Sequence, residues 1–212
     1  LDTTNNGTVT FNSDGTTTVS AAITAAGAVT FGNTKTGTLT ISANISTSDD
    51  NITFTRAVTL GASITLDPNA ASGSTGNVTF TSSLTATTAG TQTLTIGSAG
   101  DKGGVTFTGA VGATPLGNLT IAANDVTFSS TVAVQGAIDI DAVTDGFDTG
   151  DVSFANDVTT TGSGTVTISN AGTLTISEGA DFNLNGAFTQ DGAGAVSLGA
   201  NITTTQDNIS FT

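Results

Sequence analysis

Five aspartates cluster in one short segment of the chain and could bind a calcium ion. The segment, residues 138–151, reads I-D-I-D-A-V-T-D-G-F-D-T-G-D. Calcium takes six to eight oxygen ligands, and aspartates at short spacings around glycine turns can supply them. The spacing matches neither an EF-hand nor the glycine–aspartate nonapeptide repeat of calcium-binding β-helices. The sequence leaves two interpretations, a calcium site or a solvated turn, for Asp139, Asp141, Asp145, Asp148 and Asp151.

Side chains that usually perform catalysis are scarce. The chain has no histidine and no cysteine, and Glu178 is its one glutamate. General acid–base and nucleophilic mechanisms rely mostly on such groups. Paired carboxylates on a β-helix can cleave polysaccharides, but the scattered aspartates form no convincing pair and no aromatic platform for a sugar is evident. We therefore expect no enzymatic activity, and no cofactor other than calcium.

Pairs of threonines separated by one residue raise the possibility of ice binding. A flat face of paired threonines on a solenoid is the device of several ice-binding proteins. Threonine is also a good strand former on an outward face, and these pairs do not recur in every coil. The pairs are Thr8/Thr10, Thr38/Thr40, Thr93/Thr95, Thr165/Thr167 and Thr173/Thr175.

The charge balance narrows the range of partners. Lys35, Arg56 and Lys102 are the only cations, and the net charge is −14. Nucleic acid requires a basic surface that neutralises phosphates, so nucleic-acid binding is excluded. Anionic membrane surfaces are disfavoured for the same reason, and no apolar run approaches the ~18 residues of a membrane span. An acidic chain without cysteine is consistent with export.

The elements that position these residues are short strands of a recurring apolar–hydroxyl–aromatic pattern. Copies such as V-T-F at 78–80 alternate with a second type such as L-T-I at 94–96. Period-two alternation predicts strands with one buried and one solvated face. Three strands in each coil of about 20–27 residues predict an all-β, parallel β-helix. We expect an internal column of phenylalanines at Phe11, Phe31, Phe54, Phe80, Phe107, Phe128, Phe154 and Phe211.

A polar residue precedes many of these strands. Asparagine, aspartate and glycine tolerate left-handed backbone geometry or cap a turn with the side chain. Stacked coils would bring these residues into a column in which side chains form a hydrogen-bonded ladder. The predicted turn ladder is Asn51, Asn77, Asp125, Asp151 and Asn208.

A long-period repeat indicates one continuous solenoid over residues 1–212. Residues 1–55 align with 158–212 at a constant offset of 157; for example, Asp50–Asn51–Ile52 matches Asp207–Asn208–Ile209. We interpret the chain as a segment of a longer array. A solenoid cut within a repeat leaves unpaired strand edges, so we expect both ends to pair with further repeats of the same chain or with copies stacked head to tail.

Two strings resemble a known group of proteins. F-T-G-A-V-G-A-T-P-L-G-N-L-T-I (107–121) and F-T-Q-D-G-A-G-A-V-S-L-G-A-N-I (188–202) resemble the repeats of giant bacterial surface proteins of the filamentous-haemagglutinin and autotransporter type. The resemblance implies export in an unfolded state and folding outside the cell as a right-handed parallel β-helix. It implies an extracellular or cell-surface location and a role in stalks, adhesins or sheaths.

Three functions follow from these expectations, in order. The first is a structural segment of a stalk, filament or sheath in a very large secreted protein. The second is a binding module that recognises glycans or partner cells through its side face. The third is an ice-binding or polysaccharide-active β-helix.

Overall fold

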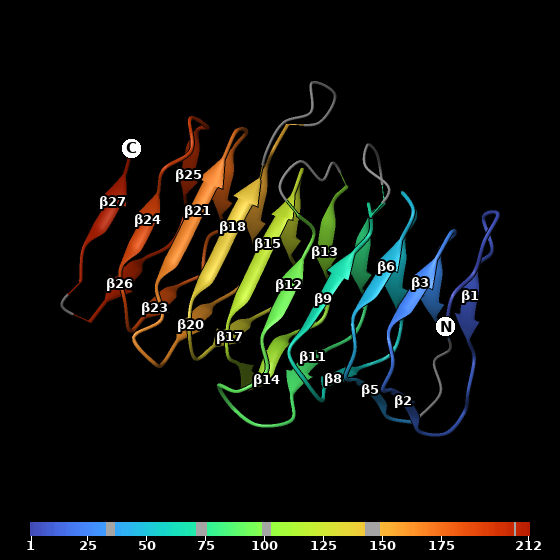
Figure 1. Cartoon of the computed structure of the whole chain (residues 1–212). Helices are drawn as coiled ribbons and strands as arrows, with labels where there is room; N and C mark the ends of the chain where they lie inside the picture. The colour runs from blue at the N-terminus through green and yellow to red at the C-terminus, as the bar shows by residue number, and fades with distance from the viewer. Residues whose placement is uncertain (33–36, 71–75, 99–102, 143–148, 206) are drawn as a thin grey trace.

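The chain folds into three parallel β-sheets that wind together as a solenoid (Figure 1). The computed structural model describes residues 1–32, 37–70, 76–98, 103–142, 149–205 and 207–212. Every regular element among these residues is a β-strand. Successive strands enter sheets I, II and III in turn, so that each coil contributes one strand to each sheet. The predicted all-β, parallel fold with three strands per coil is confirmed.

Each sheet contains nine strands. Sheet I is β1 (Val9–Phe11), β4 (Val29–Phe31), β7 (Ile52–Phe54), β10 (Val78–Phe80), β13 (Val105–Phe107), β16 (Val126–Phe128), β19 (Val152–Phe154), β22 (Leu174–Ile176) and β25 (Val196–Leu198). Sheet II is β2 (Thr17–Val19), β5 (Leu39–Ile41), β8 (Val58–Leu60), β11 (Leu84–Ala86), β14 (Val111–Leu116), β17 (Val132–Val134), β20 (Val158–Thr160), β23 (Phe182–Leu184) and β26 (Ile202–Thr204). Sheet III is β3 (Ile23–Ala25), β6 (Ile45–Thr47), β9 (Ile64–Asp67), β12 (Leu94–Ile96), β15 (Leu119–Ala123), β18 (Ile138–Ala142), β21 (Val166–Asn170), β24 (Phe188–Gln190) and β27 (Ile209–Phe211).

The strands are short because only a few residues in each segment keep the period-two alternation. In β10, Val78 and Phe80 are buried while Thr79 between them faces outward, and the same pattern recurs in most strands. Residues of the same type lie beside each other in paired strands. Val9 lies beside Val29, 20 residues later, and Val78 lies beside Val105, 27 residues later. These coil lengths are the ones predicted.

Strand β14 departs from this regularity. It pairs with β17 at Val111↔Val132 and Leu116↔Val134, with a register shift between the two pairs. Gly112 has a φ of 83°, and a Cβ atom there would lie 2.0 Å from the carbonyl oxygen of Ala133. Only glycine tolerates both this backbone angle and this approach. The bulge therefore depends on Gly112.

A stack of phenylalanine rings runs along the inside of sheet I. Seven consecutive rings have centroids 4.6–5.1 Å apart and planes within 12° of parallel. This separation matches the spacing of neighbouring strands, so the backbone rise sets the stacking distance. Six rings are buried and the first, Phe11, is half-buried at the N-terminal end. The predicted column is present at Phe11, Phe31, Phe54, Phe80, Phe107, Phe128 and Phe154.

The assignment of Phe211 to this column is wrong. Phe211 ends β27 in sheet III, opposite Gln190 of β24, and 43% of it is exposed. Sheet I instead continues from Phe154 with an isoleucine and a leucine in the next two coils. Two other phenylalanines, Phe182 in sheet II and Phe188 in sheet III, fill the core near this end. The repeat of residues 1–55 in 158–212 therefore conserves this strand, but the second copy of the strand joins a different sheet.

Several buried polar side chains at the corner between sheets III and I are hydrogen-bonded. The Gln190 amide nitrogen donates to the Asn170 side-chain oxygen at 3.0 Å and to the Gly192 carbonyl at 2.7 Å. Three coils or more away, the Thr47 hydroxyl donates to the Pro68 carbonyl at 2.9 Å. Burying such groups without partners would cost free energy. These bonds instead tie adjacent coils together at the corner.

Candidate functional site

In the described part of the chain, the aspartates of the candidate calcium site do not lie together in one group. Asp139 and Asp141 lie on β18 and are both exposed on its outer face. Asp145 and Asp148 lie outside the described residues. Asp151 precedes β19, and its carboxylate accepts a hydrogen bond from the backbone N–H of Thr173 at 2.6 Å. In the part of the chain that the structure describes, no three acidic side chains are grouped closely enough to hold a metal ion.

The turn ladder forms at the corner that precedes sheet I. Each side-chain oxygen accepts a hydrogen bond from a backbone N–H one coil later: Asn51 from Asn77 at 2.8 Å, and Asn77 from Gly104 at 2.6 Å. Asp125 accepts from the Asp151 N–H at 2.8 Å, and Asp151 accepts in turn from Thr173. The ladder thus supplies hydrogen-bond acceptors to backbone N–H groups at the start of the strands, which would otherwise bond to water.

Asn208 is not part of that ladder. It precedes β27 in sheet III, where its carbonyl oxygen accepts from the Phe188 N–H at 3.0 Å. A second ladder, which was not predicted from the sequence, precedes sheet II: Asp157 accepts from the Asp181 N–H and Asp181 from the Asn201 N–H, both at 3.0 Å. An aspartate or asparagine directly before an apolar strand was the available signal.

The paired threonines are spread over all three sheets. Thr8/Thr10 and Thr173/Thr175 fall on sheet I, Thr38/Thr40 on sheet II, and Thr93/Thr95 and Thr165/Thr167 on sheet III. No two of these pairs occupy adjacent coils of one sheet. Outward hydroxyls do line up from coil to coil on all three sheets. The column on sheet I runs through every coil and consists of Thr10, Thr30, Thr53, Thr79, Thr106, Thr127, Ser153, Thr175 and Ser197.

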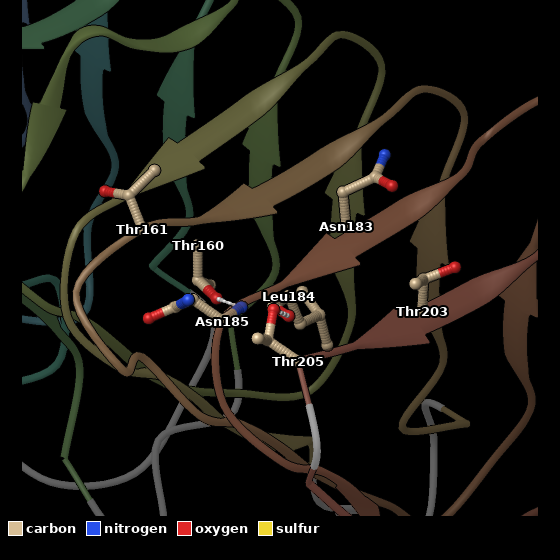
Figure 2. Close-up of a pocket in the computed structure, with 7 residues that line it drawn as sticks. All are labelled: Thr160, Thr161, Asn183, Leu184, Asn185, Thr203 and Thr205. Carbon is tan, nitrogen blue, oxygen red and sulfur yellow. Dashed lines mark hydrogen bonds between the residues drawn. The ribbon is translucent and has the colours of Figure 1, made fainter.

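A shallow open hollow of about 300 Å³ lies at the edge of sheet II near the C-terminal end (Figure 2). Hydroxyl and amide side chains dominate its lining, and several are already bonded: Thr160 Oγ1 accepts from the Asn185 N–H at 2.9 Å and donates to the Gly164 carbonyl at 2.8 Å. Among the described residues, no charged or aromatic side chain lines the hollow, so these residues offer hydrogen bonds but no acid–base pair. Its lining residues are Thr160, Thr161, Asn183, Leu184, Asn185, Thr203 and Thr205.

The C-terminal end face is the largest exposed apolar feature of the described residues. It comprises the inward side chains of the last coil, which no later strand covers. Their exposed fractions are 38% for Val196, 50% for Leu198, 44% for Ile209 and 43% for Phe211. Strands β25, β26 and β27 also end their sheets here, so each presents an unpaired backbone edge. We call this surface the C-terminal face.

The N-terminal end is more closed than expected. Residues 1–3 run along β3: the Thr24 N–H donates to the Leu1 carbonyl at 2.9 Å, and the Thr3 N–H to the Thr24 carbonyl at 3.0 Å. Val19 and Ile23 of the first coil are consequently buried, although Leu1 itself is 62% exposed. The first coil is therefore partly covered by residues 1–3, whereas no described strand covers the last coil.

Arg56 is a buried cation that the sequence analysis counted only as a charge. It is 4% exposed, and its guanidinium donates to the carbonyls of Ser13 at 3.0 Å, Gly15 at 3.1 Å and Gly37. These carbonyls belong to the two preceding coils. The rigid fork of arginine donors suits several acceptors at once, and Arg56 therefore clasps three coils at the corner between sheets I and II.

The fold and these surfaces define a β-solenoid with an open, apolar end. Comparison with protein families, with characterised proteins and with solved structures finds no match. No helix in the described ranges is long and apolar enough to cross a membrane.

Proposed function

We propose that this chain is a structural segment of a stalk, filament or sheath, built into a very large secreted protein of the bacterial cell surface. The observation that supports this most directly is the unbroken stacking of three parallel sheets from the first coil to the last. A stack of this kind resists bending because every coil is bonded to its neighbours on three sides. Its stability is a sum of similar neighbour terms, so it can be lengthened without a new core.

The chemistry of the side faces favours a spacer over a catalyst. The described outer positions are largely threonine, serine, asparagine and aspartate, and the net charge of −14 keeps such a surface solvated. The polar hollow of Figure 2 has hydrogen-bonding groups but no ionisable side chain among its lining residues. The extracellular location is supported by the resemblance of the repeats and by the absence of cysteine.

Recognition of a glycan through the side face is the second candidate. The hollow favours it, because Asn183 and Thr203 lie side by side on neighbouring strands and both can bond sugar hydroxyls. Glycan sites usually add an apolar or aromatic platform to such groups, and Leu184 is the one large apolar residue among the described lining residues. Glycan recognition through the side face is therefore a weaker proposal than the structural role.

The experiment that tests the structural role is a length series. Proteins containing one, two and three copies of residues 1–157, each followed by residues 158–212, are compared by small-angle X-ray scattering. We expect a constant cross-section and an increase in length of about 32 Å per added copy, since 20 strands at three per coil rise about 4.8 Å per coil. A widening cross-section, or a length that varies like a flexible string of beads, would contradict the rod.

A further inference from the structure

The last coil repeats a coil from the N-terminal half, strand for strand. Strands β25, β26 and β27 begin and end 157 residues after β5, β6 and β7, without any shift in their bounds. The segments before the strands also match, since Ala43–Asn44–Ile45 recurs as Ala200–Asn201–Ile202. The chain therefore contains the same coil twice.

The two copies lie on different sheets. Strands β5, β6 and β7 belong to sheets II, III and I, whereas β25, β26 and β27 belong to sheets I, II and III. The repeat advances 20 strands, and at three strands per coil this is six coils and two strands. Each repeat is thus turned by one sheet about the solenoid axis relative to the one before. All three sheets can accept this coil because each presents the same parallel edge.

The two copies also differ in what covers them. In the first copy, β8 and β10 pair with β5 and β7, placing Val58 on Leu39, Leu60 on Ile41, Val78 on Ile52 and Phe80 on Phe54. The covered side chains are at most 1% exposed, whereas their counterparts on the C-terminal face are 38–50% exposed. The same four positions are therefore core in one copy and surface in the other. The counterparts are Val196, Leu198, Ile209 and Phe211.

The corner that Arg56 clasps is also repeated. Gly15 and Gly37, whose carbonyls accept from Arg56, correspond to Gly172 and Gly194. The two glycines of each pair are closely stacked. A Cβ atom added at Gly37 would lie 2.0 Å from the carbonyl oxygen of Gly15, and one added at Gly194 would lie 1.7 Å from the carbonyl oxygen of Gly172. The two corners differ in their donors, because at the second corner the Asn170 side-chain amide already donates to the Gly172 carbonyl at 2.7 Å.

We propose that the C-terminal face is a docking surface for one coil with the sequence of residues 56–80, joined after Thr212. This coil, the counterpart of β8, β9 and β10, covers the four exposed side chains in the register seen in the first copy. The inference rests on the proposed structural role and adds the sequence of the partner coil and its one-sheet rotation.

The experiment extends the full chain with a second copy of residues 56–80 and measures amide hydrogen exchange. We expect the amides of β25, β26 and β27 to exchange at least about tenfold more slowly than in the 212-residue chain, because paired edges exchange only on local opening. A matched control makes Val58→Ser and Phe80→Ser in the added copy alone. A second control adds residues 82–107, which also contain three strands.

Each outcome decides the inference. Protection by residues 56–80, reduced by the two serine substitutions and weaker with residues 82–107, supports it. Equal protection by residues 82–107 overturns the choice of partner coil while leaving the structural rod intact, since any coil then seals the end. Absence of protection with every extension overturns the docking surface, and the length series separately reports on the rod.

Discussion

Replacing Phe107 with alanine removes a ring from the middle of the phenylalanine stack. Phe107 is 1% exposed, and its ring lies 5.0 Å from that of Phe80 and 4.8 Å from that of Phe128. A buried Phe→Ala change costs about 3–5 kcal/mol through lost burial and the cavity left behind. Because the ring stacks on both sides, and each aromatic pair adds about 0.5–1.5 kcal/mol, we expect a loss near the top of that range.

Equilibrium unfolding in urea, followed by far-ultraviolet circular dichroism, measures this loss. Hydrogen exchange in β13 and its neighbours accompanies it, because a solenoid can open locally without melting its distant coils. The matched control is Phe211→Ala, whose ring is 43% exposed and has one described ring contact, with Phe188 at 5.3 Å. We expect the control to lose about 1 kcal/mol or less. Equal losses in the two variants would show that position in the stack does not determine stability.

Three further changes follow from particular contacts. Gly112→Ala should destabilise the chain by about 1–3 kcal/mol, because the residue has a φ of 83° and no room for a Cβ; an unchanged urea midpoint would contradict the bulge. Asn77→Ala should cost about 1 kcal/mol by removing the acceptor for the Gly104 N–H, whereas Asn77→Asp should retain most of the stability; equal effects of the two would refute the ladder. Because Asp151 already bonds Thr173 and Asp139 faces outward, we expect a calcium chelator to leave the thermal midpoint unchanged, and a clear fall would instead place a metal at this segment.

The strand pattern could be predicted from the sequence because each strand carries its own signal. In V-T-F at 78–80 the alternation identifies both the strand and its buried face, and Asn77 before it marks the corner. Parallel stacking then follows, because equal residues recur one coil apart. These are local features, and a local reading of the sequence is sufficient for them.

Which sheet a strand joins could not be predicted in the same way. Phe211 and Asn208 carry the local signals of the column and the ladder, yet both lie on sheet III. Their position depends on the number of strands that precede them, which is counted along the whole chain. Several strands follow one another at short intervals around Phe182 and Phe188, so the number of strands is difficult to count there from the sequence. The sheet that a strand joins therefore depends on how the complete chain winds.

The role of Arg56 was also hidden. A lone arginine in a corner usually reads as a solvated charge, and nothing in T-R-A at 55–57 indicates burial. Its partners are backbone carbonyls of Ser13, Gly15 and Gly37, which any sequence would supply. Only the stacking of three coils brings those carbonyls to one point.

The central claim, that the chain is a rod segment whose C-terminal face is an exposed apolar strand edge, is tested most directly by light scattering over a concentration series. The wild-type chain is compared with the double variant Leu198→Asp and Phe211→Asp, which places charges on the C-terminal face. We predict that the mass of the wild-type protein grows with concentration while the variant remains monomeric, because the exposed apolar coil drives association. A wild-type protein that stays monomeric at the highest concentration would contradict the claim.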